Sequence, residues 1–288
     1  MPPCAETLFR RLLPRACLCL ALAAAPARAL SPLPEHVDPR VLAMGGAARS
    51  TAEPVSAARV NPAALARRRG FFSAVHYGHR QTGSVNALSV VLVDNITSPL
   101  GGAIQYLHFQ GEQGQERDDL SLGLAWGKKG LWWGATARLI RGQEPGQAGW
   151  DSEITADVGL LFERPSGIRI AVVGSDVLGT SLGFVDRRIA LGVSTPEMFG
   201  WTLAADVVRN LDRRFSEGVD LHLGAEYVFE RPALAVRFGQ MWRGDTGKDY
   251  ASAGVAWRVG RFTLEYGVQK ARQRSGEWLH ALGVEAPL

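Results

Sequence analysis

Asp220, His222 and Glu226 occupy alternate positions of one stretch, so on a β-strand their side chains would project from the same face. A histidine between two carboxylates can act as a proton relay or as the base of an enzyme site. The interpretation we favour is structural. These groups, with Arg237 and Arg258, would form ion pairs that join neighbouring strands to a segment packed against them.

Other catalytic and metal-binding patterns are missing from the sequence. No G-x-S-x-G, Walker or Rossmann pattern occurs. His76 and His79 are three residues apart, so on a strand they point to opposite faces and are poorly placed to share a metal. The three cysteines are Cys4, Cys17 and Cys19, all near the N-terminus. We therefore expect no enzymatic activity, no metal and no cofactor.

Residues 1–29 have the features of a secretory signal peptide. Basic Arg10, Arg11 and Arg15 precede an apolar stretch at 16–25, and Ala27-Arg-Ala29 fits a cleavage site. We predict Sec-type export with cleavage near Ala29, in preference to a lipoprotein or a membrane anchor. This segment holds four of the 32 basic and one of the 28 acidic residues. The remainder is nearly neutral, which gives no electrostatic reason to expect a nucleic-acid partner.

A period of two residues dominates the chain after Gly70. Residues 219–229 show it best, since apolar side chains occupy every second position and polar or small ones lie between them. The predicted strands cover residues 70–79, 85–93, 101–109, 118–127, 130–141, 152–163, 167–175, 186–195, 199–209, 218–229, 232–242, 250–258, 261–270 and 277–285. Twelve strands are the alternative, because the registers of the first three are ambiguous.

Three features favour a membrane barrel over a soluble β-sandwich. Aromatic residues such as Trp126, Trp133 and Phe162 gather near strand ends, as in interfacial girdles. Tight connections alternate with longer polar ones, which places both termini on the periplasmic rim. The polar face also carries too many charges for a dry core. We predict a lumenal charge network of Glu153, Asp157, Asp220, His222, Glu226, Arg237, Arg258 and Glu265.

The face assignment makes two expectations about substitutions. Leu223→Arg on the lipid face should impair insertion, whereas Gly224→Ser on the lumenal face should be mild.

Residues 30–69 differ from the rest and are predicted to form a plug ahead of a barrel at 70–288. Gly45 and Gly46 permit unusual backbone conformations, and the Ala-rich run after them can pack into a confined space. Asn61 should cap a helix from Pro62 to about Arg68. The predicted plug residues are Met44, Gly45, Gly46, Asn61 and Pro62.

The arginines at 67–69 close the predicted plug segment. They are expected near the lumenal acids or, alternatively, at the periplasmic rim.

The segment Arg40-Val-Leu-Ala-Met-Gly-Gly-Ala47, followed by Asn61-Pro-Ala-Ala-Leu65, resembles the amino-terminal region of the FadL superfamily of outer-membrane proteins. Residues 134–140, 156–161, 173–179, 223–227 and 236–239 are similar to barrel segments of its PorV-like branch. The resemblance implies an all-β fold, a fourteen-stranded transmembrane antiparallel barrel closed by a short helical N-terminal hatch. In FadL proteins this architecture takes up hydrophobic compounds.

Two functions follow from the resemblance. The first is a plugged outer-membrane channel for small hydrophobic compounds, and the alternative is a PorV-like protein that docks a partner protein. The expected partners are outer-membrane lipids and either a hydrophobic small molecule or that partner. FadL proteins have a kinked third strand, so Pro99, Gly101 and Gly102 are a candidate lateral gate, although an ordinary turn explains the same residues.

Overall fold

The computed structural model describes residues 37–82, 85–111, 114–143, 149–182, 185–214, 218–231, 233–244, 246–273 and 277–287. The predicted signal peptide and the first residues of the predicted plug, 30–36, lie outside these described residues.

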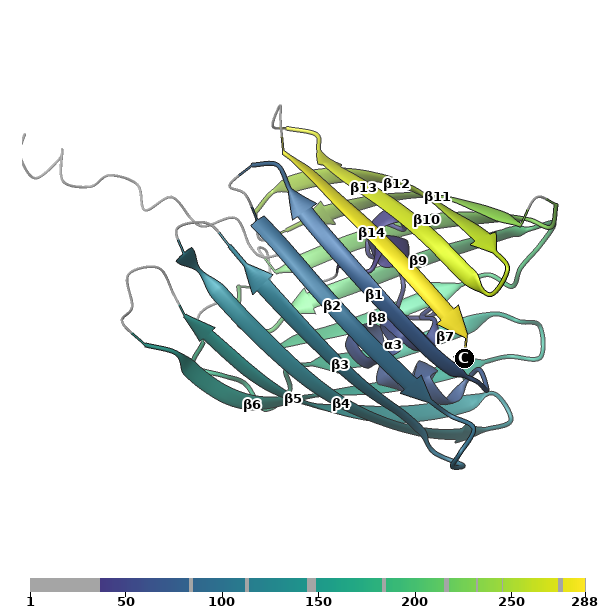
Figure 1. The fold of residues 1–288 in the computed structure, drawn as a ribbon, viewed down its shortest axis with the longest axis horizontal. Helices are drawn as coiled ribbons and strands as arrows, with labels where there is room; N and C mark the ends of the chain where they lie inside the picture. The colour runs from purple at the N-terminus through teal and green to yellow at the C-terminus, as the bar shows by residue number, and fades with distance from the viewer. Residues whose placement is uncertain are drawn as a thin grey trace, which may run out of the picture. The chain divides into compact units, whose positions relative to one another are not determined.

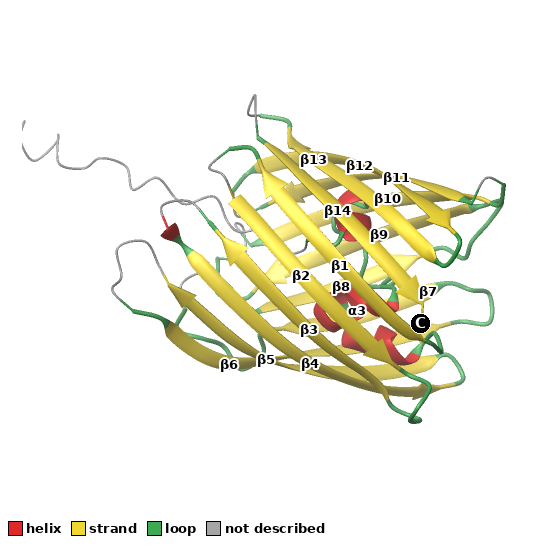
Figure 2. Ribbon diagram, in the orientation of Figure 1, coloured by secondary structure: helices red, strands yellow, loops and turns green. Residues whose placement is uncertain are grey.

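Fourteen antiparallel strands form one closed barrel within the described residues (Figures 1 and 2). They are β1 (Phe71–Arg80), β2 (Val85–Asp94), β3 (Gly101–Gln110), β4 (Glu116–Lys128), β5 (Leu131–Gln143), β6 (Asp151–Glu163), β7 (Arg169–Ser175), β8 (Arg188–Ser194), β9 (Trp201–Asn210), β10 (Val219–Phe229), β11 (Leu234–Arg243), β12 (Lys248–Val259), β13 (Phe262–Ala271) and β14 (Trp278–Pro287). Each strand pairs with its sequence neighbours, and β1 pairs with β14 to close the wall. The prediction of fourteen strands is confirmed.

Apolar side chains cover the outside of the wall and polar or small ones face inward. On β4, Leu120, Leu122 and Leu124 are 38%, 55% and 59% exposed, whereas Ser121 and Gly123 between them are buried. The same alternation runs through the other strands. A continuous apolar outer surface of this kind is incompatible with water and suits the hydrocarbon core of a membrane.

The two rims of the barrel differ. The connections 129–130 and 260–261 are tight, and Lys129 and Gly130 have φ values of 54° and 85°, as in the two-residue turns that join twisted strands. The end of β14 pairs with Phe72, so it lies at this short-turn rim. The ends of β5 and β7 and the starts of β6 and β8 lie at the opposite rim, which we call the long-loop rim.

Three short helices precede the wall: α2 (Pro39–Ala43), α3 (Pro54–Val60) and the 3-10 helix η1 (Pro62–Ala66). They lie inside the ring of strands, where α2 packs on β11–β14 and η1 on β3–β6 (Figure 2). The Asn61 side chain accepts a hydrogen bond from the Ala63 amide at 3.1 Å, so the predicted cap is present. The predicted helix is shorter than expected and of the 3-10 type, and α2 and α3 were not predicted.

No described helix has both the length and the apolar composition needed to cross a membrane.

Candidate functional site: the occluded lumen

The plug, residues 37–69, packs its backbone directly against inward-facing glycines of the wall. A β-carbon on Gly101 would lie 2.7 Å from the Leu65 carbonyl oxygen, and one on Gly267 would lie 2.5 Å from that of Pro39. Gly134, Gly224 and Gly239 also meet plug backbone, whereas Gly78, Gly123, Gly159, Gly192, Gly254 and Gly283 meet plug side chains; we call all eleven the seat glycines. Because no other residue lacks a β-carbon, only glycine permits the close approach of plug backbone.

Gly224 shows that one expectation was wrong. A β-carbon there would lie 2.7 Å from the Met44 carbonyl oxygen and 2.8 Å from the end of its side chain. Gly224→Ser therefore requires the plug to shift, and the substitution is not mild. The sequence identifies the lumenal face but not what packs against it.

The predicted plug residues Met44, Asn61 and Pro62 are all buried in the lumen. Gly45 and Gly46 have φ values of 62° and 82°, the left-handed region that their sequence suggested. This turn brings Gly46 against the imidazole of His222 on the wall.

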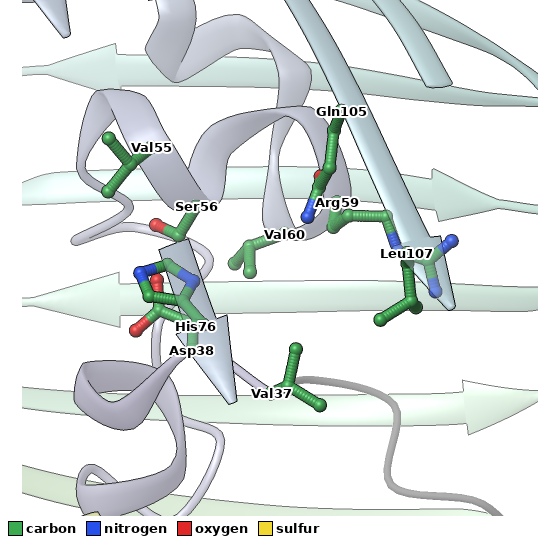
Figure 3. Close-up of a pocket in the computed structure, with 9 residues that line it drawn as sticks. All are labelled: Val37, Asp38, Val55, Ser56, Arg59, Val60, His76, Gln105 and Leu107. Carbon is green, nitrogen blue, oxygen red and sulfur yellow. The ribbon is translucent and has the colours of Figure 1, made fainter. Parts of the chain in front are cut away.

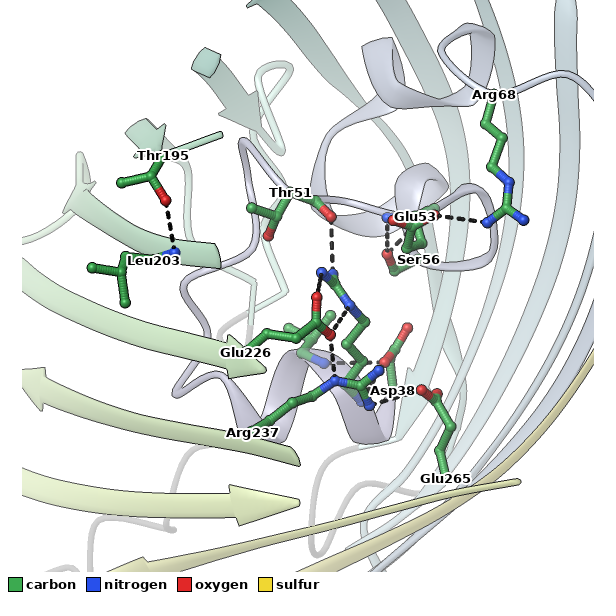
Figure 4. A network of polar contacts seen from close by, with 12 residues as sticks. Asp38, Thr51, Glu53, Ser56, Arg68, Thr195, Leu203, Glu226, Arg237 and Glu265 are labelled. Atoms are coloured by element: carbon green, nitrogen blue, oxygen red, sulfur yellow. Dashed lines mark hydrogen bonds and ion pairs between the residues drawn. The ribbon is translucent and has the colours of Figure 1, made fainter. Parts of the chain in front are cut away.

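A first anchor ties α2 to the wall (Figure 4). The guanidinium of Arg40 donates to both carboxylate oxygens of Glu226, at 3.0 and 3.1 Å, and to the Thr51 carbonyl at 2.9 Å. Glu226 also accepts from Arg237 at 2.6 Å, and Arg237 donates to Glu265 at 2.8 Å. Burial lowers the pKa of Arg40, but the surrounding carboxylates, Glu226 first and then Glu53 and Asp38, together outweigh burial and the net shift is upward. The guanidinium therefore stays charged.

A second anchor ties α3 to β4, β5 and β6. Arg59 donates to Asp119 at 2.7 Å. Arg138 joins Asp119 at 3.2 Å to Asp157 at 3.3 Å and Asp176 at 2.6 Å. Burial and the nearby Arg138 lower the pKa of Arg59 to about 10 against the opposing attraction of Asp119, which still leaves it charged at neutral pH. When one partner of such a buried ion pair is removed, the remaining charge stays buried without a partner, and this strongly destabilises the folded protein.

A third anchor holds the turn between α2 and α3. Asp206 on β9 is fully buried and accepts from the amides of Ala48 and Arg49 at 2.9 and 3.0 Å. The Arg49 guanidinium approaches the same carboxylate at 3.3 Å. Asn61 donates from its side chain to the Arg49 carbonyl at 2.8 Å, which connects this turn to η1.

The predicted lumenal residues therefore belong to separate groups. Glu226, Arg237 and Glu265 form the first anchor, and Asp157 belongs to the second.

The remaining predicted lumenal residues lie outside the first and second anchors. Asp220 accepts from the Gly244 amide at 2.8 Å, and Glu153 accepts from the Ser181 amide. Arg258 is exposed next to the short-turn rim, because β12 ends one residue later. His222 is buried against Gly46.

The arginines after η1 do not pair with lumenal acids of the wall, and Arg69 agrees with the alternative placement at the rim. Arg67 and Arg68 each approach Glu53 of the plug itself, at 3.4 Å, instead of lumenal acids of the wall. Arg69 donates to the Ile96 carbonyl in the connection between β2 and β3, at the short-turn rim.

Sequence reasoning missed Arg40, Arg59, Asp119 and Arg138. A signal for them was present: Arg40 and Arg59 are isolated charges in an apolar segment predicted to be enclosed, so each required a carboxylate on the wall. The period of two also places Asp119 and Arg138 on the inward face.

A small cavity remains between the plug and strands β1 and β3 (Figure 3). Its volume is about 20 Å³, enough for one water molecule and too small for an aromatic hydrocarbon. The lining side chains are those of Val37, Asp38, Val55, Ser56, Arg59, Val60, His76, Gln105 and Leu107. Among the described residues there is no cluster of three or more histidine, cysteine or acidic side chains that could hold a metal.

The wall is closed at the candidate lateral gate. β3 pairs with β2 from Gly102 to Gln110 and with β4 from Gly101 to Gln110. Gly101 faces Leu65 of the plug, and Pro99 lies in the preceding connection. The lateral gate stays a hypothesis about another state of the wall.

Fold and site together define a barrel whose lumen is filled by its own N-terminal segment. The structure is similar to a Pseudomonas aeruginosa FadL homologue, with a TM-score of 0.65 and 10% identity over 90% of this chain and 100% of the other. It is also similar to the Pseudomonas putida toluene transporter TodX, with a TM-score of 0.62 and 12% identity over 87% and 98% of the two chains. At these identities the likeness shows the fold alone. Neither the protein-family models nor the curated proteins give a match.

Proposed function

We propose that this protein is an outer-membrane channel that takes up small hydrophobic compounds. The observation that carries the proposal is an apolar cluster inside the barrel, formed by Val37, Val85, Ala87, Leu107 and Phe109. It adjoins the small cavity, since Val37 and Leu107 belong to both. Apolar surface beside the charged anchors of the lumen gives a hydrophobic compound a place to leave water.

The proposed location follows from the apolar outer wall and from the sequence features of residues 1–29. We expect export, cleavage near Ala29 and recovery in the outer-membrane fraction after carbonate extraction. Recovery in the soluble periplasmic fraction would contradict both the location and the channel.

Entry of a compound larger than the cavity requires the start of the plug to separate from β1. A β-carbon on Gly78 would lie 3.6 Å from that of Val37, inside the range of about 3.5–4.5 Å for disulfides. The variant V37C/G78C should therefore form a disulfide that fixes the plug start to the wall.

The test is uptake of a labelled aromatic hydrocarbon by proteoliposomes. We expect uptake by the parent protein, loss of uptake by oxidised V37C/G78C, and recovery after reduction. The single variants V37C and G78C, which cannot form this bond, serve as matched controls. Uptake that is equal in the oxidised and reduced double variant would show that the plug start does not move during transport.

The second candidate function is a PorV-like docking protein. Three buried anchors hold the plug, the wall is closed at β3, and the cavity takes only one water molecule. These features suit a barrel that presents its rims to a partner protein without transporting anything. A stoichiometric partner in pull-downs, with no hydrocarbon uptake by the parent protein, would favour this function over the channel.

A further inference from the structure

The outer face of the wall carries a belt of tyrosine–histidine pairs beside the long-loop rim. We define this belt as Tyr77 with His79, Tyr106 with His108, and Tyr266 with His280, together with Lys270 and Trp278 beside the last pair. On β1 the Tyr77 hydroxyl donates to Asn86 Oδ1 at 2.8 Å, and His79 Nδ1 meets the same oxygen at 2.9 Å.

On β3 a tyrosine and a histidine again share one acceptor oxygen, whereas on β13 and β14 the tyrosine contacts the histidine directly. Tyr106 donates to Asp118 Oδ1 at 2.7 Å, and His108 Nδ1 meets that oxygen at 2.9 Å. The Tyr266 hydroxyl lies 2.7 Å from His280 Nδ1.

The belt is continuous around one side of the barrel. His79 pairs across the ladder with His280 on β14 and with Asn86 on β2, and His108 pairs with Asp118 on β4. The row therefore spans six neighbouring strands, from β13 through β1 to β4. In the described part of the chain, every histidine outside the belt, His76 and His222, is buried.

The belt borders an apolar surface on the same strands. Nearer the middle of the wall, Leu88, Ile104 and Leu282 face outward and are 40%, 44% and 56% exposed. Lipid chains that cover these residues place their headgroups at the height of the belt. At the same rim of the opposite wall, β8 and β9 carry outward-facing Ile189 and Arg209, and these two strands contain no tyrosine or histidine.

The strongest part of the belt lies where β13 meets β14. Lys270 Nζ lies 4.7 Å from the centre of the Trp278 ring, and this ring stacks on His280 at 6.2 Å. An ammonium group suits a phosphate, and imidazole and phenol groups suit sugar hydroxyls. The Nδ1 atoms of all three belt histidines are engaged within the wall, which leaves Nε2 to meet a ligand.

We propose that the belt binds the phosphorylated sugar headgroup of a glycolipid in the outer leaflet. The proposal rests on the proposed outer-membrane location, because the long-loop rim then faces the leaflet in which such glycolipids are found. Asp118 lies at the far end of the belt from Lys270, where it accepts a hydrogen bond from Tyr106 and meets His108 Nδ1. The ligand lies on the lipid face, outside the lumen and separate from any transport path.

The test is native mass spectrometry of the folded barrel in detergent, titrated with bisphosphorylated lipid A and with its dephosphorylated form. K270A/H280A should weaken binding of the phosphorylated form about fivefold or more, because one lost cation near a lipid surface accounts for about 1 kcal/mol. The matched control is R141A. Arg141 is exposed on β5 beside the same rim and lies over Trp150 at 5.3 Å, but it is outside the belt.

Support requires a loss in K270A/H280A, none in R141A, and weaker binding of the dephosphorylated form, which the substitutions should reduce less than they reduce binding of the phosphorylated form. Equal losses in both variants would indicate general attraction to cations and overturn the proposal, as would equal binding of lipid A and phosphatidylethanolamine. H79Q, a single change on β1, provides a second measurement if the double variant does not fold, and it should also weaken binding. Hydrocarbon uptake by the parent protein tests the channel separately, so either proposal can fail alone.

Discussion

Single residues at the plug contacts carry much of the stability of the closed state, and Asp206 is the clearest case. Asp206→Ala leaves the amides of Ala48 and Arg49, and the Arg49 guanidinium, without their buried acceptor. We expect a loss of about 3–5 kcal/mol, measured by urea unfolding in detergent, and earlier cleavage of the plug by protease. The control is Asp212→Ala, because the exposed Asp212–Arg187 pair should contribute only about 0–1 kcal/mol. Equal losses would mean that burial does not strengthen the Asp206 contacts.

Phe199, in contrast, is a residue whose backbone conformation is unfavourable for its side chain. It lies in the tight turn between Met198 and Trp201, is 97% exposed and has a φ of 54°. A bulky L-residue in the left-handed region is strained, whereas asparagine tolerates that region well. Phe199→Asn should therefore stabilise the detergent-solubilised barrel by about 0.5–1 kcal/mol in urea unfolding. A loss of stability would show that the ring makes contacts outside the protein, for example with the interface of the inner leaflet.

At the scale of elements, the fit between plug and wall depends on the seat glycines. A β-carbon on Gly267 meets Pro39 of α2, so Gly267→Ala should displace that helix and cost about 1–3 kcal/mol. Protease sensitivity of the plug, together with thermal unfolding, measures the effect. Gly102→Ala is the matched control, because the nearest atom to its added carbon is 3.6 Å away. A displaced plug in both variants would mean that any change in these strands disturbs it.

The sequence predicted the strands well because their information is local. The alternation of apolar and polar residues follows from the pleat alone, and it gave the number of strands and the outward face. The helices α2 and α3 were not predicted because they are only five and seven residues long. They are mostly apolar and too short to show an amphipathic period. The ion pairs of the anchors were not predicted because their partners are far apart in the sequence. Arg40 and Glu226 are separated by 186 residues, and only closure of the barrel brings them together.

At the scale of the whole molecule, the apolar exterior decides whether the barrel inserts into a membrane. Leu223 faces outward in the middle of β10 and is 40% exposed. Leu223→Arg should reduce stability in lipid by about 2–4 kcal/mol and impair insertion into vesicles. Leu211→Arg is the control, since Leu211 is 51% exposed but lies in the connection after β9, beyond the strands. If both variants insert equally well, the outer face of the wall is not in contact with hydrocarbon.

The plug can also be tested for its effect on the whole barrel, both on the stability of the wall and on conduction through the lumen. The strand ladder closes through β1 and β14 without any plug residue, so a variant lacking residues 42–66 should keep its wall. The anchor carboxylates and arginines of the wall would then face water in the lumen. Because water solvates charges that have lost their plug partners, this loss destabilises the wall far less than it would in a dry site. We expect higher single-channel conductance in planar bilayers than for the intact protein, while resistance to heat unfolding in detergent confirms that the wall remains. The G267A variant, which displaces only α2, should give an intermediate conductance. An unchanged conductance in a deletion variant with an intact wall would mean that the plug is not what blocks ions, and a gated channel through the lumen would then be excluded.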